Sequence, residues 1–93
     1  MAKLSEQQIQ AQLGELDGWR REGETIVREL ALADFAAAIA FVDAVAELAE
    51  AANHHPDILV HGWNKLRLTL STHSEGGLTD SDFALAAQID ALR

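Results

Sequence analysis

The sequence contains no cysteine, no long uninterrupted apolar run and no apolar leader at its N-terminus. The missing cysteine excludes disulfides and thiol chemistry. No stretch approaches the ~20 apolar residues that a membrane-spanning helix needs. The opening MAKLSEQQ lacks the hydrophobic region of a signal peptide. We therefore expect a cytoplasmic protein that does not span a membrane.

Basic residues are also scarce. Seven Lys and Arg residues stand against fifteen Asp and Glu residues, which gives a net charge of −8. Direct binding of DNA or RNA is disfavoured, because phosphate neutralisation requires a basic surface. Any role near nucleic acid would run through a protein partner. The 93 residues suffice for a single domain, 1–93, with a modest core.

The pattern of polar and apolar residues predicts three helices and four strands. Ser5 with Gln8 forms a capping box, Asp34 and Thr79 are further N-caps, and Pro56 ends the second helix. The helices are expected at 5–17, 35–53 and after Thr79, and the strands at 19–22, 25–32, 58–60 and 65–72. The order α-β-β-α-β-β-α predicts an α+β fold, with a four-stranded antiparallel sheet and its helices packed on one face.

The predicted helix at 35–53 carries more apolar surface than one sheet contact needs. One row begins with Phe35 and Ile39 and a second with Phe41 and Val45, so the polar face is narrow. A helix packed on one sheet needs an apolar arc of about 100°. Two interpretations are compatible with this width: alanine used as a helix former, or a second packing partner, most simply another subunit.

Three histidines, His54, His55 and His73, fall near the ends of predicted elements. Histidine can both donate and accept protons near neutral pH, so such a group suits proton transfer. Glu50 precedes His54 by four residues, the spacing of neighbours on one helix face, and we expect its carboxylate to orient that ring. His73 follows the strand at 65–72 and should continue its polar row.

The same spacing is also compatible with two alternatives. The histidines could be unrelated surface residues, because His is common near helix C-termini. They could also bind zinc or iron, although adjacent His54 and His55 rarely chelate one ion. Asp82 is expected to complete a capping box, His61 to be exposed in a turn, and Arg28 to lie near the exposed end of its strand. Neither a G-x-S-x-G elbow nor a phosphate-binding loop is present.

Three motifs nevertheless occur together in a distinctive order. Glu50-x-x-x-His54-His55-Pro56 is followed by Leu70-Ser71-Thr72-His73 and then by Gly77-Leu78-Thr79-x-x-Asp82-x-x-Leu85-Ala86. Over nearly the whole chain, this combination resembles the pterin-4a-carbinolamine dehydratase family. The resemblance implies a lyase that dehydrates 4a-hydroxytetrahydropterin to quinonoid dihydropterin by histidine acid–base catalysis. It implies no metal and no organic cofactor, and a role in recycling the pterin of aromatic amino acid hydroxylases.

The resemblance also assigns residues and partners. It implies that the catalytic residues are His54, His55 and His73, and that the substrate-binding or supporting residues are Glu50, Asn53, Ser71, Thr72 and Asp82. It implies a homodimer or homotetramer, with a pterin-dependent hydroxylase as a possible partner. The alternative function is a protein-binding module on the same scaffold, with or without catalysis. The wide apolar face of the second helix favours that alternative, as does segment 57–64, one residue longer than the family usually has.

Overall fold

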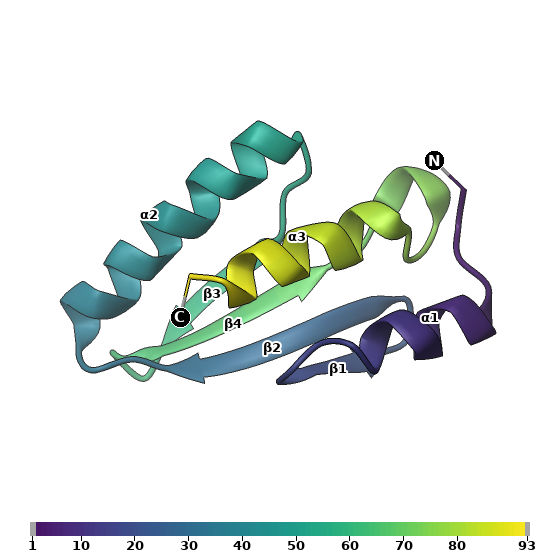
Figure 1. The fold of residues 1–93 in the computed structure, drawn as a ribbon. Helices are drawn as coiled ribbons and strands as arrows, with labels where there is room; N and C mark the ends of the chain where they lie inside the picture. Colours follow the sequence, from purple (N-terminus) through teal and green to yellow (C-terminus); the bar gives the residue numbers. More distant parts are fainter. Residues whose placement is uncertain (1, 93) are drawn as a thin grey trace.

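The computed structural model describes residues 2–92, which form one four-stranded antiparallel sheet in the order β1-β2-β4-β3. Figure 1 shows α1, α2 and α3 on the same side of this sheet, with α1 near β1 and α2 near β3. The elements are α1 Glu6–Leu13, β1 Trp19–Glu22, β2 Thr25–Ala31, α2 Phe35–Ala52, β3 Asp57–His61, β4 Lys65–Leu70, the 3₁₀ turn η1 His73–Glu75 and α3 Asp80–Asp90. The predicted fold class and element order are confirmed.

The predicted starts of the helices are confirmed, but α1 ends earlier than expected. Ser5 with Gln8 and Thr79 with Asp82 both form reciprocal capping boxes. The helix predicted to reach residue 17 ends at Leu13, because the amides of Glu15 and Leu16 bond to carbonyls three residues back and tighten the chain. The partly buried Leu16 therefore reaches the core from a turn rather than from a helix.

The two central strands carry the core. Leu66, Leu68 and Leu70 alternate along β4 and are fully buried, as their period-two spacing predicts. Ile26 of β2 pairs with Leu70 in the antiparallel register, and Arg28 pairs with Leu68. The paired strands therefore present a largely apolar surface to the helices, interrupted by Arg28.

Arg28 is a correction to the expected pattern. The sequence predicts an exposed strand end for it, but it is mostly buried on the helix-covered face. Its guanidinium donates hydrogen bonds to the Asp90 carboxylate of α3 and to the Asp17 carbonyl. The Trp19 indole also donates to Asp90, at 2.9 Å. An arginine can occupy this position because acceptors from two distant segments meet its charge.

The β3–β4 connection keeps a regular register despite its length. Gly62 and Trp63 both adopt positive φ, at 54° and 58°, which turns the chain tightly. The strands pair continuously from Asp57 opposite Thr69 to His61 opposite Lys65. His61 is the half-buried last residue of β3 rather than an exposed turn residue. The turn at Gly62 and Trp63 therefore joins β3 and β4 without interrupting their pairing.

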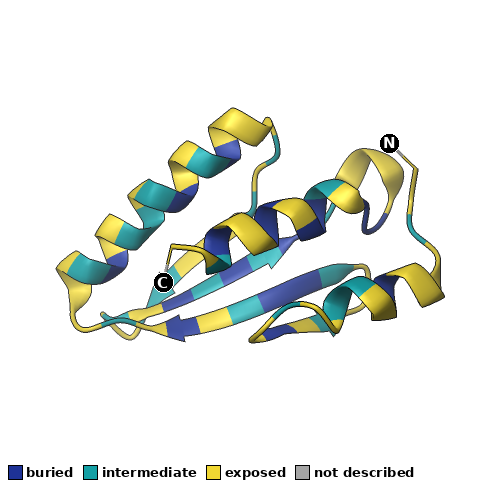
Figure 2. Ribbon diagram, viewed as in Figure 1, coloured by how far each residue is buried: buried dark blue, intermediate teal, exposed yellow. Residues whose placement is uncertain are grey.

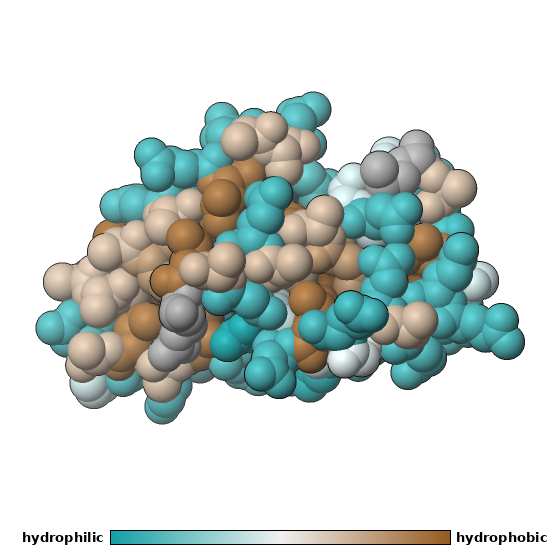
Figure 3. Space-filling model, viewed as in Figure 1, coloured by the Kyte–Doolittle hydropathy of each residue, from teal (hydrophilic) through white to brown (hydrophobic). Residues whose placement is uncertain are grey.

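Helix α2 uses only part of its apolar surface within the chain. Among its eighteen residues only Ala38, Val45 and Ala49 are buried, whereas Phe35 and Ile39 remain exposed. Figure 2 shows the buried positions along the side of α2 that faces the rest of the molecule. Figure 3 shows hydrophobic side chains gathered around α2, while the surface near α1 is mainly hydrophilic. Within residues 2–92, no helix has the length and apolarity needed to cross a membrane.

Candidate active site

The three candidate histidines come from the two segments that follow α2 and β4. Helix α2 ends because Asn53, its C-cap, adopts a left-handed conformation with φ of 50°. Pro56 then disfavours a helical backbone conformation at His55, so the chain continues in an extended conformation toward β3. His54 and His55 therefore lie beyond the helix, and their rings follow the irregular chain rather than the helix face.

His54 belongs to a hydrogen-bonded network centred on Asp82. Its Nε2 lies 2.5 Å from Asp82 Oδ1. The other carboxylate oxygen accepts from the Thr72 hydroxyl at 2.9 Å and from the backbone N–H of Thr79 at 2.9 Å. Asp82 is fully buried, so these donors replace the water that a carboxylate normally binds. Asp82 thus completes the predicted capping box and also anchors His54.

One assignment of protons satisfies this network. An ionised carboxylate only accepts hydrogen bonds, so the Thr72 hydroxyl must donate to Asp82. The hydroxyl of Thr79, 2.8 Å from that of Thr72, then donates to Thr72. By the same rule His54 Nε2 carries a proton. In this assignment Nδ1 is the His54 ring nitrogen without a hydrogen bond to residues 2–92.

The expected pairing of Glu50 with His54 is wrong. The Glu50 carboxylate instead lies 2.5 Å from Nε2 of His55, at the exposed surface. The spacing rule requires a helix that continues through residue 54, whereas the left-handed Asn53 ends it after Ala52. The change of chain direction at Asn53 brings His54 to Asp82 of α3 and leaves His55 beside Glu50 in the last turn of α2. Asn53 itself is exposed and acts as the helix cap.

His73 also departs from the expected position. The strand predicted to reach Thr72 ends at Leu70, and His73 begins η1 instead of continuing the polar row. A β-bridge between Thr72 and Gly77 closes this short loop, because their backbones exchange hydrogen bonds. The His73 side chain is exposed and makes no hydrogen bond to any residue in 2–92. Its neighbour Thr72 joins the same loop directly to the Asp82 network.

The loop that carries His73 is held from a second side by Glu24, a residue that the sequence did not single out. Ser71 Oγ donates to the Glu24 carbonyl at 2.8 Å. Lys3 donates to the Glu24 carboxylate at 2.9 Å and, together with Arg21, holds the pKa of that carboxyl below its usual value. Thr79 was likewise predicted only as a helix cap. The contacts of Glu24 with Ser71 and Lys3 join residues that are far apart in the sequence, so no spacing rule predicts them.

No group of three or more His, Asp or Glu side chains within residues 2–92 is arranged to hold a metal ion. The arrangement instead offers imidazole nitrogens on two segments that Asp82 connects, since this buried carboxylate binds both His54 and Thr72. Such a group can hold a ring in one tautomer and pass protons to and from a ligand.

Comparison with known proteins connects the chain with one described family. A family model described as pterin 4 alpha carbinolamine dehydratase matches residues 2–92. Proteins named for pterin-4-alpha-carbinolamine dehydratase from Chloroflexus aurantiacus and Nocardia farcinica are 55% and 53% identical, and the matches cover 99% and 96% of this chain and 98% and 93% of theirs. The crystal structure of a transcriptional coactivator/pterin dehydratase from Brucella melitensis superposes with a TM-score of 0.91 at 35% identity, over 97% of both chains.

A second solved structure carries a different description. It is a pterin dehydratase-like protein identified as a RuBisCO assembly factor in the alpha-carboxysome. Its TM-score is 0.69 at 32% identity, over 82% of this chain and 89% of that one. The family match spans all the described residues, and the identities over nearly full length are well above those of a shared fold alone. The chain therefore belongs to the pterin 4 alpha carbinolamine dehydratase family.

Proposed function

We propose that this protein is a hydro-lyase that removes water from 4a-hydroxytetrahydropterin and releases quinonoid dihydropterin in the cytoplasm. The observation that carries the proposal is the buried Asp82 carboxylate bound to His54 Nε2, in a member of this family. In the pathway implied by that activity, the product would be reduced again for an aromatic amino acid hydroxylase.

The reaction needs two proton transfers that balance each other. The C4a–O and N5–H bonds break, a C4a=N5 double bond forms, and water leaves. One group must protonate the departing hydroxyl while another takes the N5 proton, so no net proton is consumed. Positioned acid–base groups of this kind typically contribute ~10²–10⁴-fold to the rate.

We assign His54 as the base and an exposed histidine, His55 or His73, as the acid. When His54 Nδ1 takes a proton, the ring becomes positive, and the Asp82 carboxylate at its other nitrogen stabilises that charge. The acid must regain a proton after each turnover. Both exposed histidines can do so, because they can exchange protons with water. Ser71 and Thr72, which directly follow β4, are proposed to meet the edge of the pterin, together with Asn53 at the end of α2.

Stopped-flow measurement of the dehydration of chemically generated 4a-hydroxytetrahydropterin tests the proposal. We expect the wild-type protein to accelerate the reaction at least about 10²-fold over buffer. The variants H73A and H55A should each lose most of this acceleration while their circular dichroism stays native, because both side chains are exposed. A wild-type rate equal to that of the uncatalysed control would refute the proposed function.

We also propose that the active form is a two-fold symmetric homo-oligomer that buries the exposed part of α2. Phe35 and Ile39 are solvent-exposed there, next to small alanines that allow close approach of another helix. Light scattering at micromolar concentration should give at least twice the 10.1 kDa mass of the chain. Replacing Ile39 by Glu should lower that mass, and a wild-type monomer would contradict the assembly.

The second candidate function is protein binding on this scaffold, with catalysis lost or secondary. The specific observation in its favour is the similar protein described as a RuBisCO assembly factor. The same stopped-flow experiment separates the candidates, because a binding module without catalysis gives the buffer rate. Normal turnover with no partner recovered in a pull-down would remove this candidate.

A further inference from the structure

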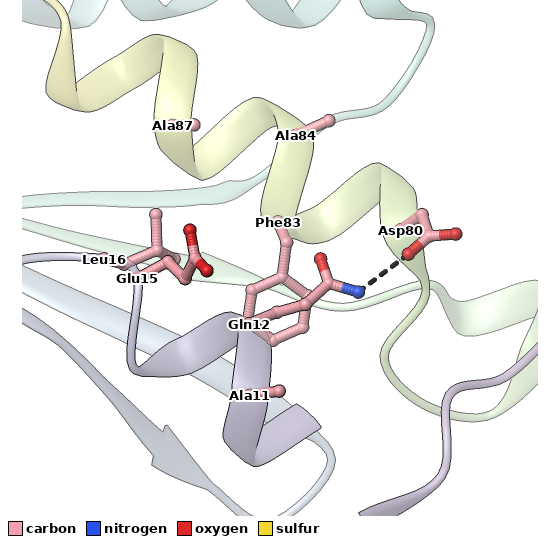
Figure 4. Close-up of a pocket in the computed structure, with 8 residues that line it drawn as sticks. All are labelled: Ala11, Gln12, Glu15, Leu16, Asp80, Phe83, Ala84 and Ala87. Atoms are coloured by element: carbon pink, nitrogen blue, oxygen red, sulfur yellow. Dashed lines mark hydrogen bonds between the residues drawn. The ribbon is translucent and has the colours of Figure 1, made fainter. Parts of the chain in front are cut away.

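A groove of about 480 Å³ lies between α1 and α3, away from the histidines. Figure 4 shows Phe83 pointing from α3 toward α1 at the floor of this groove. Leu16 and three alanines, Ala11, Ala84 and Ala87, complete its apolar lining. We call this feature the α1–α3 groove.

The groove is independent of the Asp82 network although both use α3. Asp80, Phe83, Ala84 and Ala87 recur at spacings of three and four, so they share one face of the helix. Asp82 belongs to the opposite, fully buried side. Neither His54 nor any other histidine lines the groove. A ligand in this groove would therefore not touch the residues proposed for catalysis.

The charged groups of the groove are of one sign. Glu15 and Asp80 are exposed and line it. Asp80 accepts a hydrogen bond from the Gln12 side chain at 2.8 Å, drawn as a dashed line in Figure 4. Within residues 2–92 neither carboxylate has a cationic partner, although Lys3, Arg20 and other cations of this chain do form ion pairs. The two carboxylates are therefore available to a positively charged partner.

The two segments that form the groove contain no basic residue. From residue 4 to residue 18, and again from residue 68 to residue 92, the chain contains neither Lys nor Arg. Both walls of the groove come from these two segments. An apolar trough with uncompensated carboxylates at its edges is complementary to a surface that is apolar in the middle and basic at its margins.

The shape of the groove favours a helix as the occupant. A trough between two helices receives a third helix by ridge-into-groove packing, and alanines at its sides allow the backbones to approach closely. Amphipathic helices bind such grooves through apolar residues at spacings of three, four and seven. A second copy of this chain cannot supply a basic helix, because α1, α2 and α3 contain no Lys or Arg.

We propose that the α1–α3 groove is a docking site for a basic amphipathic helix of a different protein. The helix places small aliphatic side chains over Phe83 and its Lys or Arg residues beside Glu15 and Asp80. This interaction surface lies apart from both the histidines and the exposed face of α2, so docking is compatible with turnover and with self-assembly.

A synthetic peptide of about five helical turns tests the site. The peptide carries Leu and Ala on one helical face and Lys on the flanks, and its binding is measured by fluorescence anisotropy. Changes in the ¹H–¹⁵N spectrum of the protein locate the contact. We expect shifts at Ala11, Glu15, Ala84 and Ala87, weaker binding as salt rises, and unchanged dehydration of the pterin substrate.

Two groove variants and one matched control sharpen the measurement. A84W fills the groove from an exposed position and should weaken binding about tenfold or more. E15K reverses one carboxylate and should weaken it about threefold to fivefold. E47K makes the same charge change in the polar row of α2 that also contains Asp43 and Glu50, outside the groove, and should change affinity by less than about twofold.

Each contrary result overturns the proposal. If a peptide of the same composition in shuffled order binds equally well, binding depends on net charge alone and not on an amphipathic helix. The site is also wrong if E47K weakens binding as much as E15K, or if the spectral changes lie on α2 or around His73. Absence of binding at low salt contradicts it as well. None of these results bears on the dehydratase assay, so the two proposals fail separately.

Discussion

Two histidine–carboxylate pairs occur side by side in this chain, and they differ in burial rather than in chemistry. His54 with Asp82 and His55 with Glu50 both have an Nε2–oxygen distance of 2.5 Å. The side chains of the first pair are 14% and 0% exposed, and those of the second pair 56% and 76%. The first pair joins segments 28 residues apart, whereas the second is local to the end of α2.

Burial decides which of the two pairs has a defined geometry. Around the buried pair, Thr72 and the Thr79 amide fill the remaining acceptor positions of the carboxylate, so rotation would leave groups without partners. The exposed pair competes with water and salt, and such pairs are typically worth about 0–1 kcal/mol. We therefore expect the buried pair to govern both folding and catalysis, and the exposed pair to affect catalysis alone.

The largest effect is expected for D82N. The asparagine would present an NH₂ group to His54, Thr72 or the Thr79 amide, which all need an acceptor. Loss of a buried ionic partner typically lowers the free energy of unfolding by about 3 kcal/mol or more. Thermal unfolding should show a Tm lower by roughly 15 °C, with turnover reduced at least about 10²-fold. D80N, in the same first turn of α3 but exposed, is the control and should remain within a few degrees of wild type. Equal Tm losses would show that helix capping alone matters.

A direct contrast of the two pairs comes from H54A and H55A. H54A leaves a buried carboxylate oxygen without its donor and should lower the free energy of unfolding by about 2 kcal/mol. H55A removes an exposed ring and should change it by less than about 0.5 kcal/mol. Urea denaturation measures both values, and stopped-flow assays should show turnover reduced in each variant. Similar stabilities for the two variants would remove the distinction between the pairs.

A smaller effect is expected at Thr79, whose hydroxyl donates to Thr72 when Asp82 is ionised. T79V removes that donor and the side-chain cap of α3, and should cost about 1–2 kcal/mol. T79S keeps the hydroxyl and should recover most of this loss. Thr79 positions the network if T79V lowers turnover and changes the pH–rate profile, and if T79S restores both. Loss of stability with an unaltered profile would indicate a structural role alone.

The smallest effect is expected for E50Q. The exposed pair with His55 is screened by solvent, so its removal should leave the Tm unchanged within about 2 °C. Turnover should fall only about twofold to fivefold, through looser orientation of His55 rather than of His54. The difference from wild type should shrink as salt rises. A loss of turnover as large as that of D82N would contradict this ranking.

Much of the fold was predictable because it depends on local signals. The capping residues Ser5, Asp34 and Thr79 begin the helices as expected, and the alternating leucines of β4 lie on the buried face. The boundary errors also have local causes, such as the tightened turn after Leu13. The burial of Arg28 was not predictable, because its acceptors, including Asp90, are brought to it only by tertiary packing.

The candidate residues could be proposed from the sequence, whereas their contacts could not. The sequence identifies the histidines, Glu50 and Asp82, yet it assigns Glu50 to the wrong ring. Spacing rules hold only while the helix continues, and the left-handed Asn53 is not apparent from the apolar pattern. The contacts of Asp82 with His54 and Thr72 connect three separate segments, so they depend on how α3 packs and not on any local pattern.

The double use of Asp82 has an evolutionary consequence. Because this carboxylate begins α3 and also fixes His54, a change there is removed by selection for folding even when the reaction no longer matters. A lineage that turns the scaffold to another task is therefore expected to retain Asp82 while His55 and Glu50 drift. Among divergent relatives, the exposed histidines should then be the better record of whether catalysis has been kept.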